Sequence, residues 1–246
     1  MSATKIAPGF NQLIDGLPGK ERQVILKFSE PVDLVIGMVL CEPNDAVEYA
    51  YFPLNCLISL MATTGDHQPL GVAMIGNEGV LGATLALGIE SARQRDVVLG
   101  SGSCLRLSAR RLLGVLRHSP AMERALKHHA FMVMGQLIRT AACNSFHDVE
   151  MRLARWLLMM DDRSGSDQLR LTHQVLADFL GVQRSAVTIA AGQLQRKKLI
   201  SYARGRVSIV SRKGLERESC ECYRLQMNDH ARQETRIKSH ERLIHS

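Results

Sequence analysis

The sequence has no stretch typical of a membrane span, and its first residues do not resemble a secretory leader. Its 246 residues contain no run of about 18 or more apolar residues, the length that a transmembrane helix needs. The opening stretch, MSATKIAPGFNQLIDG, has no continuous apolar core of the kind that signal peptides carry. We therefore expect a cytoplasmic protein with no membrane partner.

The sequence also lacks the composition of a disordered chain. Apolar residues make up 46% of it and charged residues 22%, which is enough apolar material for a packed core. The length suits one large domain or two smaller ones.

No C-x-x-C motif is present among the six cysteines. Cys220 and Cys222 form a close pair with His230 nearby, but a four-ligand zinc site needs more matching ligands than these. We therefore predict no metal site. The other four stand singly among apolar neighbours, which favours buried, reduced thiols: Cys41, Cys56, Cys104 and Cys143.

Positive charge is concentrated in one segment. The whole chain carries a net charge of +7, with a pI near 9.3. Residues Gln183 to Arg217 hold nine Lys or Arg and one Glu, an excess of +8, so the remainder of the chain sums to −1. Such a local excess is typical of a module that binds nucleic acid.

Residues 30–108 alternate short apolar runs with turn signals. The runs include VDLVIGMVLC, YAYFPLNCLISLMA, LGVAMI and DVVLGSGSCLRLS, separated by segments such as EPND, TTGDHQP and GNEG. This pattern predicts an antiparallel β-domain of barrel or sandwich type. An enzyme built on such a barrel would need converging His or carboxylate groups. The segment has one histidine, His67, so we predict no catalytic residues and no enzyme.

A long helix is predicted from Ser119-Pro120, an N-cap followed by a proline, to about Ser145. At 1.5 Å per residue it would be roughly 40 Å long, and part of its apolar stripe could exceed its own β-domain. We expect that stripe to join two copies of the chain, the alternative being that it packs wholly on its own β-domain. The predicted face steps by three and four residues: Met122, Leu126, His129, Val133, Leu137 and Thr140.

Asp148 can cap the following helix, VEMRLARWLLMM, after which comes the polar loop DDRSGSDQ. We predict a hinge near 146–148. The resulting division is a β-domain at 1–118, the long helix at 119–147, an α-helical domain at 148–225 and a tail at 226–246.

A helix-turn-helix is predicted next. Thr172 can cap the helix HQVLADFL, Gly181 follows its end, and Gln183-Arg184-Ser185 begins a second helix. The segment LISYARGRVSIV then predicts a β-hairpin wing with Arg204 and Arg206 at its tip. Together these form a winged helix.

The first turn of the second helix is the expected DNA-reading end. Arg184 can hold guanine O6 and N7, and Gln183, Ser185 and Thr188 can reach base edges or phosphates. Thr172 and Gln174 are expected to contact phosphate, as are Arg204 and Arg206. The cluster Arg196-Lys197-Lys198 fits either the end of a helix, where cations are favoured, or phosphate attraction.

In the order of its β-domain, long helix and winged helix, the chain resembles the Crp/Fnr transcription regulators. The most specific segments are LTHQVLADFLGVQRSAVTIAAGQLQRKKLI and RGRVSIV, and CEPND at 41–45 is similar to a turn of the family's β-roll. The resemblance implies an α+β fold with an N-terminal β-roll, and a homodimer, joined through its long helices, that reads double-stranded DNA. Arg184 matches the family's base-reading arginine, and RNA polymerase is an implied partner.

The departures from the family concern specificity. Ser185 stands where many members have Glu, and Ile189 where the cyclic-AMP-binding members have a second base-reading arginine. No cysteine precedes residue 30, so the family's N-terminal iron–sulfur cluster is not expected.

The effector site of the β-roll departs further. Gly82 is kept, but Ala83 replaces the glutamate that holds ribose, and Arg93-Gln94 stands for Arg-Ser at the phosphate. Leu137-Ile138 replaces the polar pair that meets the base. We therefore expect an unknown effector, or none, rather than cyclic AMP. The alternative function is a ligand sensor that acts through protein contacts instead of DNA.

Overall fold

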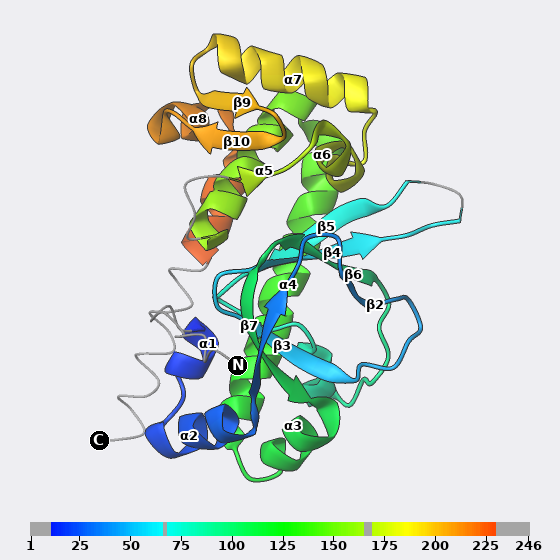
Figure 1. Ribbon diagram of the computed structural model, residues 1–246, viewed down its shortest axis with the longest axis vertical. Coiled ribbons are helices and arrows are strands. Elements are labelled where there is room, and N and C mark those ends of the chain that lie inside the picture. Colours follow the sequence, from blue (N-terminus) through cyan, green and yellow to red (C-terminus); the bar gives the residue numbers. More distant parts are fainter. Residues whose placement is uncertain (1–10, 66–67, 165–168, 230–246) are drawn as a thin grey trace. The chain divides into compact units, whose positions relative to one another are not determined.

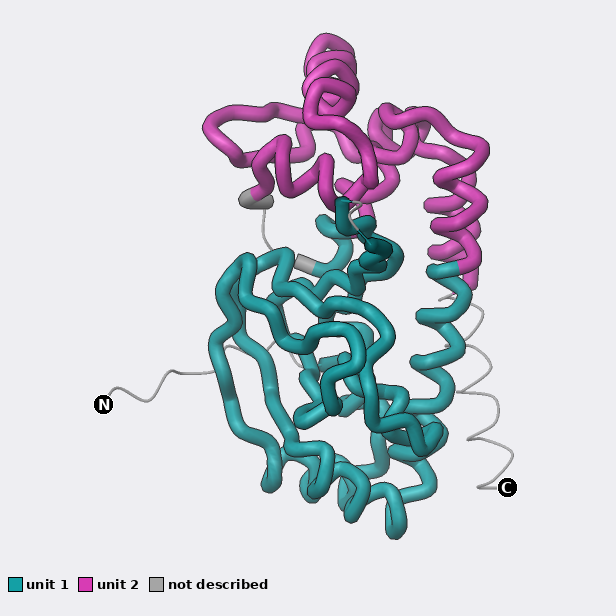
Figure 2. The backbone as a smooth tube through the Cα atoms, turned by 90° about the vertical axis from the view of Figure 1, so that its right-hand side faces the viewer, with its two compact units in different colours: residues 1–137, 160–169 teal, residues 138–159, 170–246 magenta. Residues whose placement is uncertain are grey.

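The structure is a computed structural model that describes residues 11–65, 68–164 and 169–229. His67 and His230 lie outside the described residues. The chain divides into two compact units, Met1–Leu137 with Met160–Leu169 and Ile138–Met159 with Arg170–Ser246 (Figure 2). No helix within the described ranges is long and apolar enough to cross a bilayer.

The first unit contains antiparallel sheets, as the alternating apolar runs predicted. One sheet has the strand order β1-β7-β3 and the other the order β2-β6-β4-β5 (Figure 1). The strands are β1 (Glu30–Leu34), β2 (Val39–Cys41), β3 (Tyr49–Pro53), β4 (Leu57–Ala62), β5 (Leu70–Ile75), β6 (Arg95–Gly100) and β7 (Gly102–Ser108).

Short helices flank these strands: α1 (Gln12–Asp15), α2 (Gly19–Phe28), the 3-10 helix η1 (Ala83–Leu87) and α3 (Ala109–Leu116). Gly82 precedes η1 with φ +95°, and a Cβ there would lie 3.2 Å from the Ala50 Cα atom. Both observations favour glycine at this turn. Phe52, Leu107 and Leu112 are fully buried in the core beneath.

The long helix is α4 (Pro120–Phe146), and its prediction is confirmed. The Met122 N–H donates to Ser119 Oγ at 3.3 Å, as expected for the N-cap.

The helix face predicted to join two copies is largely buried within its own chain, which is the alternative that the sequence left open. Met122 and Leu126 are fully buried in the core of the chain's own β-domain, and His129 Nε2 accepts a hydrogen bond from the Val80 N–H at 3.3 Å. Val133 packs on the second core cluster, and Thr140 is buried. The face that this periodicity marks is therefore largely the one that its own chain covers.

Other apolar side chains of α4 are exposed. Phe131, Met134 and Ile138 are 57%, 47% and 65% exposed, and Leu137, which belonged to the predicted face, is 39% exposed. These four residues are called the exposed α4 stripe below.

The second unit contains α6 (His173–Leu180), α7 (Arg184–Arg196), β9 (Ile200–Ala203), β10 (Arg206–Ile209) and α8 (Arg212–Glu218). Helix α5 (Val149–Ser164) begins in this unit, and Asp148 Oδ1 caps it by accepting from the Met151 N–H at 3.0 Å. The rings of Trp156 and Phe179 meet edge to face with centroids 4.4 Å apart, which joins α5 to α6.

A further helical segment covers residues 221–229. The expected tail at 226–246 thus begins inside a helix. Its remainder, 230–246, lies outside the described residues.

Candidate nucleic-acid interface

The turn between α6 and α7 is built by local signals. Thr172 Oγ1 accepts from the Val175 N–H at 3.2 Å, which caps α6. Gly181 then adopts a left-handed conformation, φ 62° and ψ 42°, and its N–H returns to the last turn of α6. The helix-turn-helix prediction is confirmed in these details.

Helix α7 has one covered face and one exposed face. Val187, Ala190, Ala191 and Leu194 are buried. The opposite face presents the polar residues predicted to read DNA, together with Ile189, which is 62% exposed. The exposed predicted residues are Gln183, Arg184, Ser185 and Thr188.

A small network joins α7, α6 and the hairpin. The Thr188 hydroxyl lies 2.9 Å from His173 Nδ1 and 3.0 Å from the Arg184 carbonyl, to which it donates. The His173 ring lies 4.4 Å from that of Tyr202, whose hydroxyl donates to the Leu171 carbonyl at 2.6 Å. Burial, followed by the charge of Arg184, lowers the pKa of His173. The Thr188 hydroxyl is thus engaged within the fold.

The wing is an antiparallel hairpin of β9 and β10, joined by Arg204-Gly205 and extended by β8 (Leu169–Arg170). Both turn residues have positive φ, 50° and 73°, as a two-residue hairpin of type I′ requires. Arg204 and Arg206 are exposed, and Arg206 pairs with Ala203. The predicted wing is confirmed.

Two other predicted contact residues of this region, Lys197 and Gln174, interact with carboxylates of the protein itself. Lys197 Nζ lies 2.8 Å from Glu150 and also contacts Glu218, so this member of the Arg196-Lys197-Lys198 cluster has a structural role. Gln174, a predicted phosphate contact, donates to Asp178 Oδ1 at 2.7 Å.

The residues predicted for an effector site differ in burial and in their contacts. Ala83 is buried, Arg93 is exposed, and the Gln94 amide donates to Asp96 Oδ1 at 3.0 Å. A surface pocket of about 500 Å³ lies elsewhere in the first unit, between α2 and α3. That pocket contains none of the six predicted effector residues: Gly82, Ala83, Arg93, Gln94, Leu137 and Ile138.

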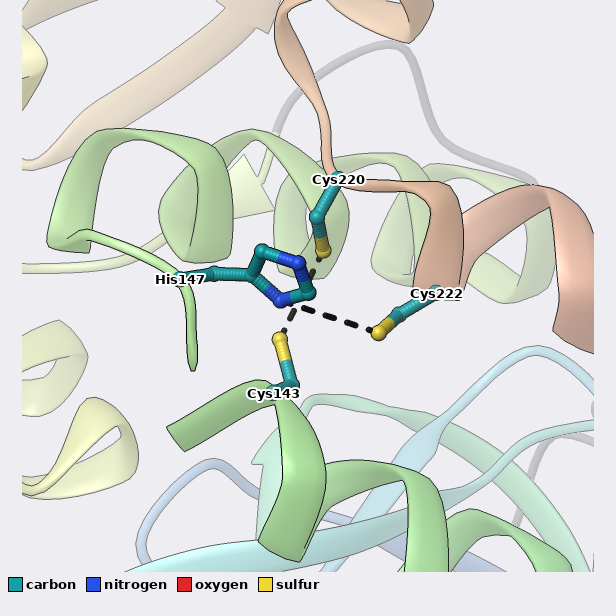
Figure 3. Close-up of side chains that lie close together, drawn as sticks. All are labelled: Cys143, His147, Cys220 and Cys222. Atoms are coloured by element: carbon teal, nitrogen blue, oxygen red, sulfur yellow. Dashed lines mark hydrogen bonds between the residues drawn. The ribbon is translucent and has the colours of Figure 1, made fainter. Parts of the chain in front are cut away.

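The structure also brings together four side chains that the sequence reasoning did not group. Cys143, His147, Cys220 and Cys222 converge in the second unit, and their ligand atoms all lie within 4.8 Å of one another (Figure 3). The hydrogen bond between the two thiols lowers the pKa of Cys143 and raises the pKa of Cys220. The available signal was the spacing Cys143-x-x-x-His147, which puts both side chains on one side of a helix end.

The β-sheets and most of the long helix lie in the first compact unit, and the second unit carries a winged helix-turn-helix. Residues 151–218 match the model of the Crp-like helix-turn-helix domain. A global nitrogen regulator of Nostoc sp. strain PCC 7120 is 23% identical over 176 residues, covering 68% of this chain and 79% of that protein.

Solved structures agree on the fold. FixK2 from Bradyrhizobium japonicum superposes with a TM-score of 0.65 at 16% identity, covering 78% of this chain and 98% of that one. A Crp/Fnr-family transcriptional regulator from Thermus thermophilus gives a TM-score of 0.61 at 22% identity, with coverages of 77% and 98%. The chain carries a Crp-like helix-turn-helix domain and has the fold of the Crp/Fnr transcription regulators.

Proposed function

We propose that this chain is a homodimeric, sequence-specific DNA-binding transcription regulator of Crp/Fnr type. The observation that carries the proposal is the first turn of α7. There Gln183, Arg184 and Ser185 are exposed together, while the opposite face of the helix is buried. A helix held in this way can enter the major groove with its N-terminal residues toward the bases.

Arg184 is the proposed base reader, because its guanidinium can donate two hydrogen bonds to a guanine. Gln183 and Ser185 contact neighbouring base edges or phosphates. The methyl of Thr188 faces the groove, since its hydroxyl is engaged with His173.

The flanking contacts are to phosphate. Thr172 and Gln174 stand at the start of α6, and Arg204 and Arg206 extend the interface along the wing. The exposed α4 stripe, defined above, supplies the apolar surface that joins two copies. A twofold dimer of this kind would read a twofold DNA site.

The β-domain holds an unknown effector or only supports the dimer. Ala83 and Gln94 replace the groups that would hold a cyclic nucleotide, so cyclic AMP is not the proposed ligand. The protein would act in the cytoplasm with RNA polymerase as a further partner.

The test is selection from a pool of random DNA duplexes, followed by binding measurements on the selected sequence. The full chain should bind that sequence in preference to random DNA, and its affinity should fall steeply with salt. Arg184→Ala should lose at least about tenfold in discrimination, the effect of one bidentate base contact. Arg110→Ala removes an exposed arginine of α3 in the first unit, away from every predicted site residue, and is the matched control.

Failure to select any sequence, or an Arg184→Ala variant equal to the control, would refute the proposal. A chain that binds no DNA but captures a protein through the same face would support the alternative of a sensor acting through protein contacts.

A further inference from the structure

Three cysteines and a histidine from separate parts of the second unit form a compact cluster. Cys143 lies in the last turn of α4, and His147 follows that helix, with the His147 N–H bonded to the Cys143 carbonyl at 3.1 Å. Cys220 and Cys222 come just after α8. Figure 3 shows the three thiols and the imidazole facing one another.

Two separations in the cluster lie in the range expected for ligands around one metal ion, and all four ligand atoms lie within 4.8 Å of one another. Cys143 Sγ and Cys220 Sγ are 3.5 Å apart, and Cys222 Sγ is 3.8 Å from His147 Nδ1. With Zn–S bonds of about 2.3 Å and Zn–N bonds of about 2.0 Å, tetrahedral angles separate neighbouring ligand atoms by about 3.5–3.8 Å. A cluster with two iron atoms would divide the four ligands into two more distant pairs.

A carboxylate outside the cluster orients the His147 imidazole so that its other nitrogen can bind a metal ion. His147 Nε2 lies 3.2 Å from Glu221 Oε2, so its N–H donates to this carboxylate. The remaining nitrogen, Nδ1, then carries the lone pair and faces the sulfurs. Metal-binding histidines in proteins commonly have such a partner.

Buried positive charge beside the thiols provides an independent argument. Arg155 is fully buried and Arg152 is 7% exposed, and both interact electrostatically with the cluster. Arg155 Nη2 donates to Gln226 Oε1 at 3.3 Å and the guanidinium lies over the Trp156 ring, but its Nε and Nη1 have no hydrogen-bond partner among the described residues. A buried guanidinium without a compensating anion is costly.

We propose that Cys143, His147, Cys220 and Cys222 bind one Zn²⁺ as a closed, structural site. Binding releases the three thiol protons, and the resulting Zn²⁺ centre with three thiolates and a neutral imidazole carries a net charge of −1. That negative charge offsets part of the buried positive charge of Arg155 and Arg152. The four protein ligands leave no open position for a substrate, which distinguishes a structural zinc site from a catalytic one.

The site would fasten the end of α4 to the segment that follows α8. Zinc would therefore stabilise the second unit and hold the winged helix against the last turn of α4. This role is separate from base reading, because none of the four ligands belongs to α6, α7 or the wing.

The experiment uses the full untagged chain, purified under reducing conditions and reconstituted with ZnCl₂ alone. Elemental analysis should find about one zinc per chain, and removal of zinc by a chelator should lower the Tm. Replacement by Co²⁺ should give thiolate-to-cobalt charge transfer and the intense visible bands of a tetrahedral site.

The variants separate a metal site from a structural group of cysteines. Cys220→Ser should lose zinc, whereas the control Cys41→Ser, which changes a cysteine outside the cluster, should retain it. His147→Cys should still bind, because four thiolates also suit zinc. Glu221→Gln should weaken zinc binding by about tenfold or more while leaving the ligands intact.

The wild-type protein alone can overturn the proposal, even if a variant fails to fold. Reduced, folded chain that takes up far less than one zinc and shows no tetrahedral cobalt spectrum would exclude the site. A Cys143–Cys220 disulfide that persists under the reducing conditions and prevents zinc uptake would overturn it equally.

Discussion

Asp96 makes the stability of the β-domain depend on pH. It lies on β6 between β2 and β4 and is 2% exposed. Burial raises the pKa of its carboxyl group to about 7, although the hydrogen bond from Gln94 acts in the opposite direction. The perturbation is Asp96→Asn, which resembles the protonated acid in shape and carries no charge.

The direction in which stability changes with pH follows from the number of protons bound in the folded and unfolded states. Because the pKa is about 7 in the folded protein and 3.8 in the reference state, the folded chain keeps this proton between about pH 4 and 7 while the unfolded chain has lost it. Stability therefore falls as pH rises through that window, by up to about 1.4 kcal/mol per pH unit, and levels off above about pH 7. The full difference of about three pKa units corresponds to roughly 4 kcal/mol.

Urea unfolding at pH 5 and pH 8 measures the effect. Asp96→Asn should gain stability relative to wild type between these two values, by about 2 to 3 kcal/mol. Asp33→Asn, which changes an exposed aspartate on β1, is the control for removing one negative charge. If wild type and Asp96→Asn show parallel pH dependence, the reasoning about the buried carboxyl group is wrong.

Three further predictions concern the second unit. Gly181→Ala should cost about 1 kcal/mol in urea unfolding, because alanine is strained at this left-handed position, and an unchanged midpoint would contradict it. Trp156→Ala should cost about 3–5 kcal/mol through the cavity beside Phe179, and a loss under about 1 kcal/mol would show that the site collapses freely. Thr188→Val should keep its DNA affinity closer to wild type than Arg184→Ala does; equal losses in a gel-shift titration would show that the hydroxyl contacts DNA directly.

Local signals were sufficient to predict the winged helix. The Thr172 cap, the left-handed Gly181 and the Arg204-Gly205 hairpin each depend on the conformational preferences of one or two residues. These preferences act at short range, so they can be predicted from the sequence and are found again in the structure.

Contacts between residues that are far apart in the sequence could not be predicted in this way. The spacing of Met122, Leu126 and His129 marks one face of a helix, but it does not identify what covers that face. Cys143 and Cys220 are 77 residues apart, so their proximity depends on the fold of the whole second unit. Their grouping could be seen only after that fold was known.

The division of α4 into two faces has a consequence for how this protein can change. Substitutions at Met122 or Leu126 should alter the unfolding of each single chain, since those side chains fill its own core. Substitutions at Phe131 or Ile138 should instead alter the protein concentration at which two chains associate. In the proposed homodimer, the stability of the folded chain and the concentration needed for dimerisation can therefore evolve through different positions of one helix.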